Sequence, residues 1–387
     1  MDKAYVGVVI SDIHFGVLKP MELYNQLKES FLDYIDNLVI LDFIIITGDL
    51  FDSKISLNSD HAKVAIQFMK RIIEIAKKKN TKIRIIKGTE SHDNKQLDVL
   101  DIFYKNEDVD FKIINTVSDE YLFENMRILY VPEEYIENKD DYYKDYFSQT
   151  YDMIFGHGLV NEVVFVASKQ ESELTMSKAP IFKTEDLLNI CKGPIFFGHI
   201  HTPQVIKERF FYVGSFSRWC FGEEEDKGFY LVSYVPEKGK FKAEFIKNKL
   251  AKTYNTVRID ETSALFKENV DKIIDNMITF INTFNADYLR FVVSIPEDYE
   301  NPLLLSNMLN EIFSKFSNVK LVINNTNKLK QKKNVEEKIN LLLEKYGFIF
   351  DKNIPHEEKI SRFLKIKYNK NIPVNKLRDY LYQQIVG

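Results

Sequence analysis

The sequence predicts an α/β protein in which a parallel sheet with flanking helices is followed by a second sheet with antiparallel pairing. Three observations support this fold class. The run Phe43–Thr47 is short, apolar and rich in β-branched residues, which is typical of a strand buried on both faces. Runs of this kind alternate with helical segments in the first 90 residues, as in right-handed β-α-β units. From Phe210 onward, strand-like runs separated by turn signals indicate antiparallel pairing.

The elements of the first 90 residues follow in a regular order. Strands are predicted at Tyr5–Ile10, at the run that begins with Phe43, and at Lys82–Ile86. One helix begins at Pro20 and has apolar residues at helical spacing, and a second is predicted from Asp60 to about Lys79. A polar loop follows each of the three strands.

The middle of the chain is predicted to contain the second sheet. A helix is expected in the charged, tyrosine-rich segment Glu133–Phe147. Strands are expected at Arg127–Val131, Met153–Phe155, Ile195–Phe197, Phe210–Val213, Gly228–Val235 and Phe241–Ile246. We therefore place a first domain at residues 1–249.

Three further segments are predicted after this domain. Residues 250–324 alternate helix and strand twice and are expected to form a small α+β domain. Residues 325–333 are polar and basic, which is typical of a linker. Residues 334–387 are predicted to form amphipathic helices, whose many apolar residues we expect to bind a partner; they are Val335–Tyr346, Pro355–Tyr368 and Val374–Val386.

Composition limits the class of protein. The chain has 387 residues, 45% of them hydrophobic, which allows a large core. Its two cysteines, Cys191 and Cys220, are too far apart for a CxxC pair, so we expect a reduced, cytoplasmic setting. We recognise no signal peptide and no apolar run of membrane-spanning length, and expect no membrane association. Residues 325–387 carry 14 Lys and Arg against 7 Asp and Glu. This basic tail either binds nucleic acid or an acidic partner, or is a solvated helical surface.

Residues that carry chemistry gather at five predicted strand ends. Five of the seven histidines lie there, most of them next to Gly or in an Asp-x-His or His-x-His pair. A single Asp after a strand is as typical of a turn as of a ligand, but scattered core histidines would not give the joint pattern. The strand-end residues are Asp12, His14, Asp49, His92, His157, His199 and His201.

These residue types predict a binuclear metal centre. Carboxylates and imidazoles without thiolates favour Mn²⁺, Fe²⁺ or Zn²⁺. Six ligating side chains exceed the need of one catalytic ion with an open position, and suit two ions about 3.5–4 Å apart that share a carboxylate. Such a pair lowers the pKa of a bridging water and neutralises phosphoryl oxygens during in-line attack. The residues therefore predict phosphoester hydrolysis.

The motifs resemble those of the calcineurin-like metallophosphoesterases. The matching runs are Asp12-x-His14, Gly48-Asp49-x-x-Asp52, His92-Asp93, Gly156-His157 and Gly198-His199-x-His201. Ser11–Gly16, Gly48–Asp52 and the later run Val213–Gly228 resemble, more narrowly, SbcD-type nuclease subunits of double-strand-break repair and recombination complexes, a group that includes phage recombination endonuclease subunits. This resemblance covers residues 5–235 by motif and implies a two-sheet metallophosphoesterase sandwich with flanking helices. Residues 250–324 would then be a DNA-steering capping domain.

The resemblance also implies roles for the individual residues. His92 would protonate the leaving oxygen or steady the phosphate, and Asp52 would orient His92; the alternative for Asp52 is a helix-capping carboxylate. Two divalent ions, most typically Mn²⁺, would share Asp49. The implied ligands are Asp12, His14, Asp49 and His201 for one ion, and Asp49, His157, His199 and one further ligand for the other.

The loop after Lys82–Ile86 departs from the family pattern. The family has Gly-Asn-His-Asp, in which the Asn is a metal ligand. This chain has Gly88-Thr-Glu-Ser-His92-Asp93, which is two residues longer and lacks the Asn. Ser91, Glu90 or a water could take the place of the missing ligand.

The function implied by the resemblance is a metal-dependent DNA exonuclease or endonuclease in recombination, repair or replication. It would act on double-stranded DNA together with an SbcC-type coiled-coil ABC ATPase bound by the C-terminal helices. Helices at Met21–Leu38 and Asp60–Lys79 would form a homodimer, and a phage-encoded protein would act in the host cytoplasm. Two alternatives stay open: a phosphoesterase for a small molecule or a phosphoprotein, and a non-catalytic scaffold of the same fold.

Overall fold

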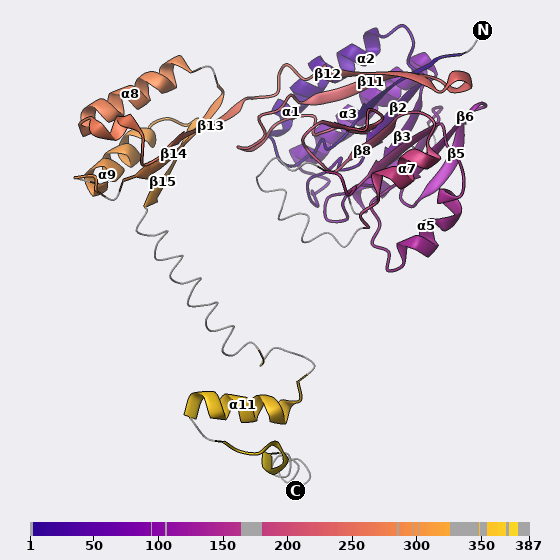
Figure 1. Cartoon of the computed structure of the whole chain (residues 1–387). Helices are drawn as coiled ribbons and strands as arrows, with labels where there is room; N and C mark the ends of the chain where they lie inside the picture. Colours follow the sequence, from indigo (N-terminus) through magenta and orange to yellow (C-terminus); the bar gives the residue numbers. More distant parts are fainter. Residues whose placement is uncertain are drawn as a thin grey trace. The chain divides into compact units, whose positions relative to one another are not determined.

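The computed structural model describes residues 3–93, 95–104, 107–163, 180–284, 286–296, 298–300, 302–325, 348, 354–368 and 371–377. The chain divides into two compact units (Figure 1). Unit 1 comprises residues 1–256 and 284–290, and unit 2 comprises residues 257–283 and 291–387. Within the described part of the chain, no helix has the length and apolar character needed to cross a membrane.

The first sheet of unit 1 has six strands in the order β12-β11-β1-β2-β3-β4. Its four parallel strands are β1 (Tyr5–Ile10), β2 (Phe43–Thr47), β3 (Lys82–Ile86) and β4 (Phe111–Ile114). Two antiparallel strands, β11 (Gly228–Val235) and β12 (Lys240–Lys247), extend the sheet beyond β1. The chain therefore returns to the first sheet after it has built the second.

The second sheet also has six strands, in the order β5-β6-β7-β8-β10-β9. Its parallel centre is formed by β6 (Met126–Val131), β7 (Met153–His157), β8 (Ile195–Gly198) and β10 (Phe210–Tyr212). Antiparallel strands β5 (Ser118–Phe123) and β9 (Gln204–Ile206) form its edges. Both sheets are thus mixed.

Helices flank this two-sheet sandwich (Figure 1). Alternate residues of β2 face opposite layers: Phe43 and Ile45 lie in the core between the two sheets, whereas Ile44 and Ile46 pack with the helices of the first sheet. These helices are α1 (Pro20–Gln26), the π-helical η1 (Leu27–Leu32), α2 (Asp33–Asn37), α3 (Asp60–Lys79) and α4 (Gln96–Tyr104). A third core packs the second sheet with α5 (Lys139–Phe147) and α7 (Thr184–Ile190).

The ends of α3 show how the sequence sets a helix boundary. The side chain of Ser59 accepts a hydrogen bond from the backbone N–H of Ala62, which satisfies one of the free donors of the first turn. Three lysines in the last turn oppose the negative end of the helix dipole. Asn80 then takes a left-handed conformation (φ 57°) and ends the helix.

The predicted two-sheet sandwich is confirmed, but β11 and β12, which were expected in an antiparallel second sheet, extend the first sheet instead, and β10 pairs in parallel with β8. Within unit 1, strands β4, β5 and β9 and helices α4 and α7 were not predicted. Strand β4 has four residues and β9 only three, too few for a period of two to stand out in the sequence. Helix α4 follows a polar turn within the loop that carries His92, which hid its first turn.

Unit 2 and its junction with unit 1 contain a three-stranded sheet in the order β13-β14-β15. The strands are β13 (Tyr254–Ile259), β14 (Tyr288–Ile295) and β15 (Val319–Asn325); the helices are η3 (Ala264–Lys267), α8 (Val270–Thr283) and α9 (Pro302–Phe313). Phe291 of β14 stacks on Phe313 of α9, with ring centroids 5.5 Å apart. Helix α11 (His356–Tyr368) forms where a helix was predicted. The predicted linker at 325–333, apart from residue 325, and the predicted helix Val335–Tyr346 lie outside the described residues. Residues 378–386 of the last predicted helix lie outside them as well.

Candidate metal centre

Four strand ends, two from each sheet, bring the predicted side chains together. Asp12 and Asp49 each lie two residues after a strand of the first sheet, β1 and β2. His157 is the last residue of β7, and His199 directly follows β8 in the second sheet. A Cβ atom on Gly48 would collide with the ring of His157, so the close approach of β2 and β7 requires glycine there. The site therefore lies at a carboxyl edge shared by both sheets.

The backbone is strained at the predicted site. Asp12, His14, Asp49 and His199 have φ values of 48°, 51°, 50° and 87°, which residues with a Cβ rarely adopt. Only three other non-glycine residues of the described chain have positive φ. Such strain persists where the surrounding structure imposes it, and it is commonly found at functional sites.

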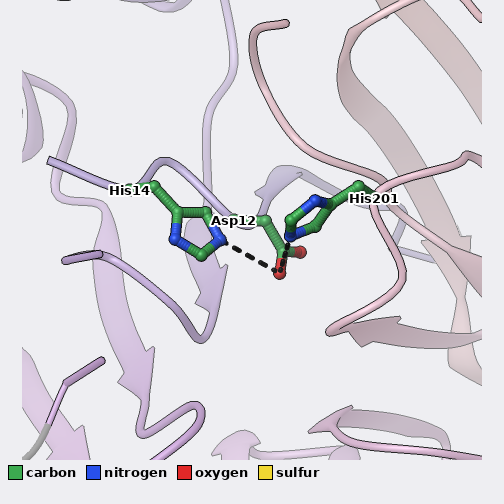
Figure 2. A group of neighbouring side chains, drawn as sticks. All are labelled: Asp12, His14 and His201. Carbon is green, nitrogen blue, oxygen red and sulfur yellow. Dashed lines mark ion pairs between the residues drawn. The ribbon is translucent and has the colours of Figure 1, made fainter. Parts of the chain in front are cut away.

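Asp12, His14 and His201 form a first cluster of potential ligands (Figure 2). Nε2 of His14 and Nε2 of His201 each lie 3.9 Å from Oδ1 of Asp12. Nε2 of His14 also lies 3.8 Å from Oδ2 of Asp49. Both ring nitrogens of His14 are buried, and neither makes a well-aligned hydrogen bond with a described residue. A buried imidazole without such partners is costly, and a cation held between these atoms would satisfy it.

Asp49, His157 and His199 form a second cluster. Nδ1 of His157 donates a hydrogen bond to the carbonyl oxygen of Thr47 at 2.7 Å, which aims Nε2 at Oδ2 of Asp49, 3.3 Å away. The backbone N–H of His199 donates to both oxygens of Asp12, at 3.0 and 3.2 Å. Asp49 approaches His14 of the first cluster and His157 of the second, and so links the two clusters.

The carboxylates of these clusters attract positive charge. Burial lowers the pKa of His157, but the charge of Asp49 and its hydrogen bond outweigh burial and raise the pKa to about 10. Burial raises the pKa of Asp49, but the charges and hydrogen bonds of His157 and His92 outweigh burial and hold that pKa well below its usual value. Buried carboxylates that hold protons on their neighbours in this way are a suitable environment for a divalent cation.

His92 lies at the open side of the clusters. Its Nδ1 is 2.8 Å from Oδ2 of Asp49, and its side chain is 26% exposed, more than the histidines of either cluster. Burial lowers its pKa, but the hydrogen bond to Asp49 and the charges of Asp49 and Asp52 raise it to about 9. His92 therefore carries a proton near neutral pH in a position that a substrate can reach.

Asp52 does not occupy its predicted place. It was expected to orient His92, but its Oδ1 lies 3.4 Å from Nδ1 of His14 instead. The contact with His14 lowers the pKa of Asp52. The x-x-Asp spacing after Asp49 fits both geometries, so the sequence could not distinguish them. Asp52 therefore faces His14, a candidate ligand of the first cluster, and its charge raises the pKa of His92.

A comparison with protein families identifies the family of this fold. The family model for calcineurin-like phosphoesterases matches residues 8–203. The chain belongs to the calcineurin-like phosphoesterase family. The match spans β1 to the end of β8 and the following loop, and so includes all eight predicted site residues.

Other comparisons add little to the family assignment. No curated protein matches the chain. Forty chains of solved structures match it. One is a crystal structure with 10% sequence identity and a TM-score of 0.35 that covers 63% of this chain and 100% of its own. A likeness of that size carries no argument about the fold or the function.

Members of this phosphoesterase family use divalent metal ions, and the buried clusters fit such ions. The donor set contains only carboxylates and imidazoles, which suit borderline or hard cations. Nε2 of His14 and Nε2 of His157 each face Oδ2 of Asp49, so a cation between them could take the place of a proton. As the family suggests, the phosphoesterase is a hydrolase of phosphoesters; which residues hold the ions stays a prediction.

Two carboxylates around the clusters were not assigned from the sequence. Asp93 is fully buried and accepts hydrogen bonds from the backbone N–H groups of Asp49, Phe51 and Gly88, so it ties the His92 loop to the Asp49 loop. Glu223 lies 3.4 Å from Nδ1 of His201 and accepts from the N–H of Trp219. Both were quoted within motifs, but neither was given a role.

The third unassigned group is in the second cluster. Glu133, only 3% exposed, places its Oε2 3.2 Å from Nδ1 of His199. Thr89 places its hydroxyl within 3.5 Å of the same carboxylate and of both histidines. Glu133 follows the end of β6 by two residues, as Asp12 follows β1 and Asp49 follows β2. That shared offset was the signal that could have found it.

Proposed function

We propose that this phosphoesterase is a Mn²⁺-dependent nuclease that hydrolyses phosphodiester bonds of double-stranded DNA. The observation that carries the proposal is the meeting of two His/Asp clusters at Asp49, which is the arrangement needed to hold two cations across one phosphoryl group. The choice of DNA is supported by the resemblance of Ser11–Gly16, Gly48–Asp52 and Val213–Gly228 to SbcD-type subunits.

The side chains divide the work of the reaction. Cations held by the two clusters would supply a water of lowered pKa and would neutralise charge on the phosphoryl oxygens. Asp49 holds its position between the clusters because Thr89 N–H and Asp93 fix its side chain and backbone. When the water oxygen forms its bond to phosphorus, the bond to the leaving sugar oxygen breaks. Protonated His92 is placed to give that oxygen its proton.

We further propose that the phosphoesterase works with an SbcC-type coiled-coil ABC ATPase in recombination, repair or replication. The support is the basic, apolar-rich character of residues 334–387. Residues 250–324 would steer DNA, and α1 to α3 would form a homodimer. Deletion of residues 334–387 is expected to leave metal-dependent cleavage intact and to abolish capture by an ATPase coiled coil in a pull-down. Retained capture would contradict this assignment of the tail.

A cleavage assay tests the nuclease proposal. The purified chain is expected to degrade linear duplex DNA with Mn²⁺ at low salt, where phosphate contacts are least screened. Asp49→Ala and His92→Ala are expected to abolish cleavage while circular dichroism shows a retained fold. Turnover of small phosphodiesters without action on DNA would favour the small-molecule alternative. Metal binding without cleavage, alone and with the ATPase, would favour the scaffold.

A further inference from the structure

A buried carboxylate that the family pattern does not include, that of Glu133, lies beside the second cluster. In that pattern an asparagine follows the glycine of the loop after β3, but here Thr89 follows Gly88. We propose that Glu133, from the loop after β6, is the fourth protein ligand of the second cation and replaces the missing amide. The inference rests on the proposed binuclear function, because it names a ligand of that same centre.

The spacing of the donor atoms is the first support. Oε2 of Glu133 lies 3.2 Å from Nδ1 of His199 and 3.9 Å from Nε2 of His157, which in turn lies 3.3 Å from Oδ2 of Asp49. Ligands about 2.0–2.2 Å from one ion in tetrahedral geometry stand roughly 3.3–3.6 Å from each other. These distances place the Glu133 carboxylate close enough to His157 and His199 to share a cation with them.

The position of Thr89 is the second support. Its Oγ1 lies 3.3 Å from Asp49 Oδ2 and from Glu133 Oε2, and 3.5 Å from the facing nitrogens of His157 and His199. One small polar group thus stands among all four donor atoms. Its backbone N–H is bound to the other oxygen of Asp49 at 2.7 Å, which keeps the loop at the cluster.

The other residues considered for the missing ligand lie elsewhere. Glu90 forms an ion pair with Lys87, and its side chain is 45% exposed. Ser91 is exposed. The two extra residues of the loop therefore extend away from the second cluster, and the loop itself offers only the Thr89 hydroxyl there.

The burial of Glu133 is the third support. Its side chain is 1% exposed, and a carboxylate removed from water needs compensating charge. Tyr135 donates to its second oxygen at 3.4 Å, a long hydrogen bond. A cation shared with both histidines would stabilise the charge more fully.

A carboxylate in place of an amide changes the chemistry of the second cluster. The cluster would carry two formal negative charges, from Asp49 and Glu133, where the family pattern carries one. Carboxylate oxygens favour hard ions such as Mn²⁺ and Mg²⁺ over Zn²⁺. We therefore expect this chain to hold its second ion more tightly than an amide would allow, and to prefer Mn²⁺.

Metal binding to the full chain, without substrate, tests the ligand assignment. Equilibrium dialysis is expected to give two Mn²⁺ per wild-type chain. Glu133→Ala is expected to weaken the second Mn²⁺ by at least about 100-fold and Glu133→Gln by about 10-fold, because its amide oxygen remains a neutral donor. Glu137→Gln, an exposed change of the same charge on the same segment, is the matched control and should bind as wild type.

The single tryptophan verifies that the first cluster survives in each variant. The ring of Trp219 lies 4.9 Å from the rings of His14 and His201, so a paramagnetic Mn²⁺ in the first cluster should quench its fluorescence. Glu133 variants are expected to keep this quenching at wild-type concentration of Mn²⁺. Retained quenching together with an unchanged circular dichroism spectrum shows that the variant is folded.

A thiolate substitution separates a ligand from a residue that only orients His199. With Co²⁺, Glu133→Cys is expected to give the near-ultraviolet charge-transfer absorption of a thiolate–Co²⁺ bond, and Glu137→Cys is not. Two Mn²⁺ of unchanged affinity in Glu133→Ala, or no such absorption in Glu133→Cys beyond the control, would overturn the assignment. If these variants change metal binding as expected but the wild-type chain does not cleave DNA, the proposed nuclease function is overturned and the ligand assignment stands.

Discussion

The two clusters of the metal centre are oriented by different kinds of partner. In the first, carboxylates lie behind the histidines: Asp52 behind His14 and Glu223 behind His201, each at 3.4 Å. In the second, a backbone carbonyl holds His157, that of Thr47. The first cluster is thus arranged by side chains that mutation can remove, and the second partly by the β2 backbone. The difference teaches that two clusters with the same types of side chain can differ in how strongly a single mutation changes their orientation.

The clusters also differ in closeness. Donor atoms of the first lie 3.8–3.9 Å apart, whereas those of the second include pairs at 3.2 and 3.3 Å. With Glu133, the second cluster draws on β6 as well as on β2, β7 and β8. We expect the second cluster to be the more rigid of the two, and the first to depend more on its surrounding acids.

The largest effect is expected at Asp49, because this residue is common to both clusters and the difference between them does not apply to it. Asp49→Asn should remove the charge that both cations share and lower Mn²⁺ affinity at both, with a loss of cleavage of about 10⁴-fold or more. Equilibrium dialysis and a DNA cleavage assay measure the two effects. Asp98→Asn, an exposed change in α4, is the control. Loss of one ion only would show that Asp49 serves a single cluster.

His92 should separate proton transfer from metal binding. Its proposed role as proton donor predicts that His92→Gln lowers kcat by about 10²–10⁴-fold and leaves two Mn²⁺ bound. Single-turnover cleavage and dialysis on the same preparation measure this. His61→Gln, at the start of α3, is the control. A loss of bound Mn²⁺ in His92→Gln would instead make His92 a ligand.

Glu223 should distinguish the clusters from each other. Glu223→Gln removes the acid behind His201 and is expected to weaken Mn²⁺ at the first cluster about 10–100-fold, with the second unchanged. Titration of Trp219 quenching measures the first cluster, and dialysis measures the total. Equal weakening of both ions would contradict the division of the centre into two separately oriented halves.

The pKa of Glu223 sets the pH range of that effect. Burial raises the pKa, but the hydrogen bond to His201 and the charge of Lys227 outweigh it and lower the pKa to about 2. Stability from this depressed pKa is present above the unfolded value of about 4.3 and is lost as pH falls toward 2. The difference in Mn²⁺ affinity at the first cluster between Glu223→Gln and the native chain should therefore be constant from pH 6 to 8. A difference that varies across that range would mean that Glu223 titrates there.

The smallest effect is expected at Glu90. This residue was a candidate for the missing ligand, but it pairs with Lys87 at the surface. Glu90→Gln should change Mn²⁺ affinity and cleavage by less than about twofold and the free energy of unfolding by less than about 0.5 kcal/mol. Thermal unfolding and the same binding assay measure this. A strong loss of the second ion would return Glu90 to the coordination shell and count against Glu133.

The sequence predicted what depends on local order. Four ligand candidates lie at or just after the end of a strand that is recognisable as an apolar run: Asp12, Asp49, His157 and His199. The strand and the candidate could therefore be predicted together. Parallel strands then bring these ends to one edge. The two-sheet arrangement was implied by the family motifs, and the family match bears it out.

The remainder depends on contacts between distant segments, which spacing does not encode. Whether Asp52 meets His14 or His92 is decided by the path of two loops, and the sequence prediction was wrong about it. Glu133 escaped notice because it follows its strand without a neighbouring glycine or histidine. The replacement of the family asparagine was sought within its own loop, whereas the carboxylate that we propose to replace it lies 44 residues after Thr89 along the chain.

The hydrogen bond from His157 to Thr47 joins the two sheets at the point where the cations would sit. Asp12 and Asp49 belong to one sheet and His157 and His199 to the other, so any ion held among them cross-links the halves of the sandwich. Loading with Mn²⁺ should raise the melting temperature, and chelation should lower it. The ions that serve hydrolysis would then also stabilise the contact between the two sheets. A chain that had lost its ions would be less stable as well as inactive.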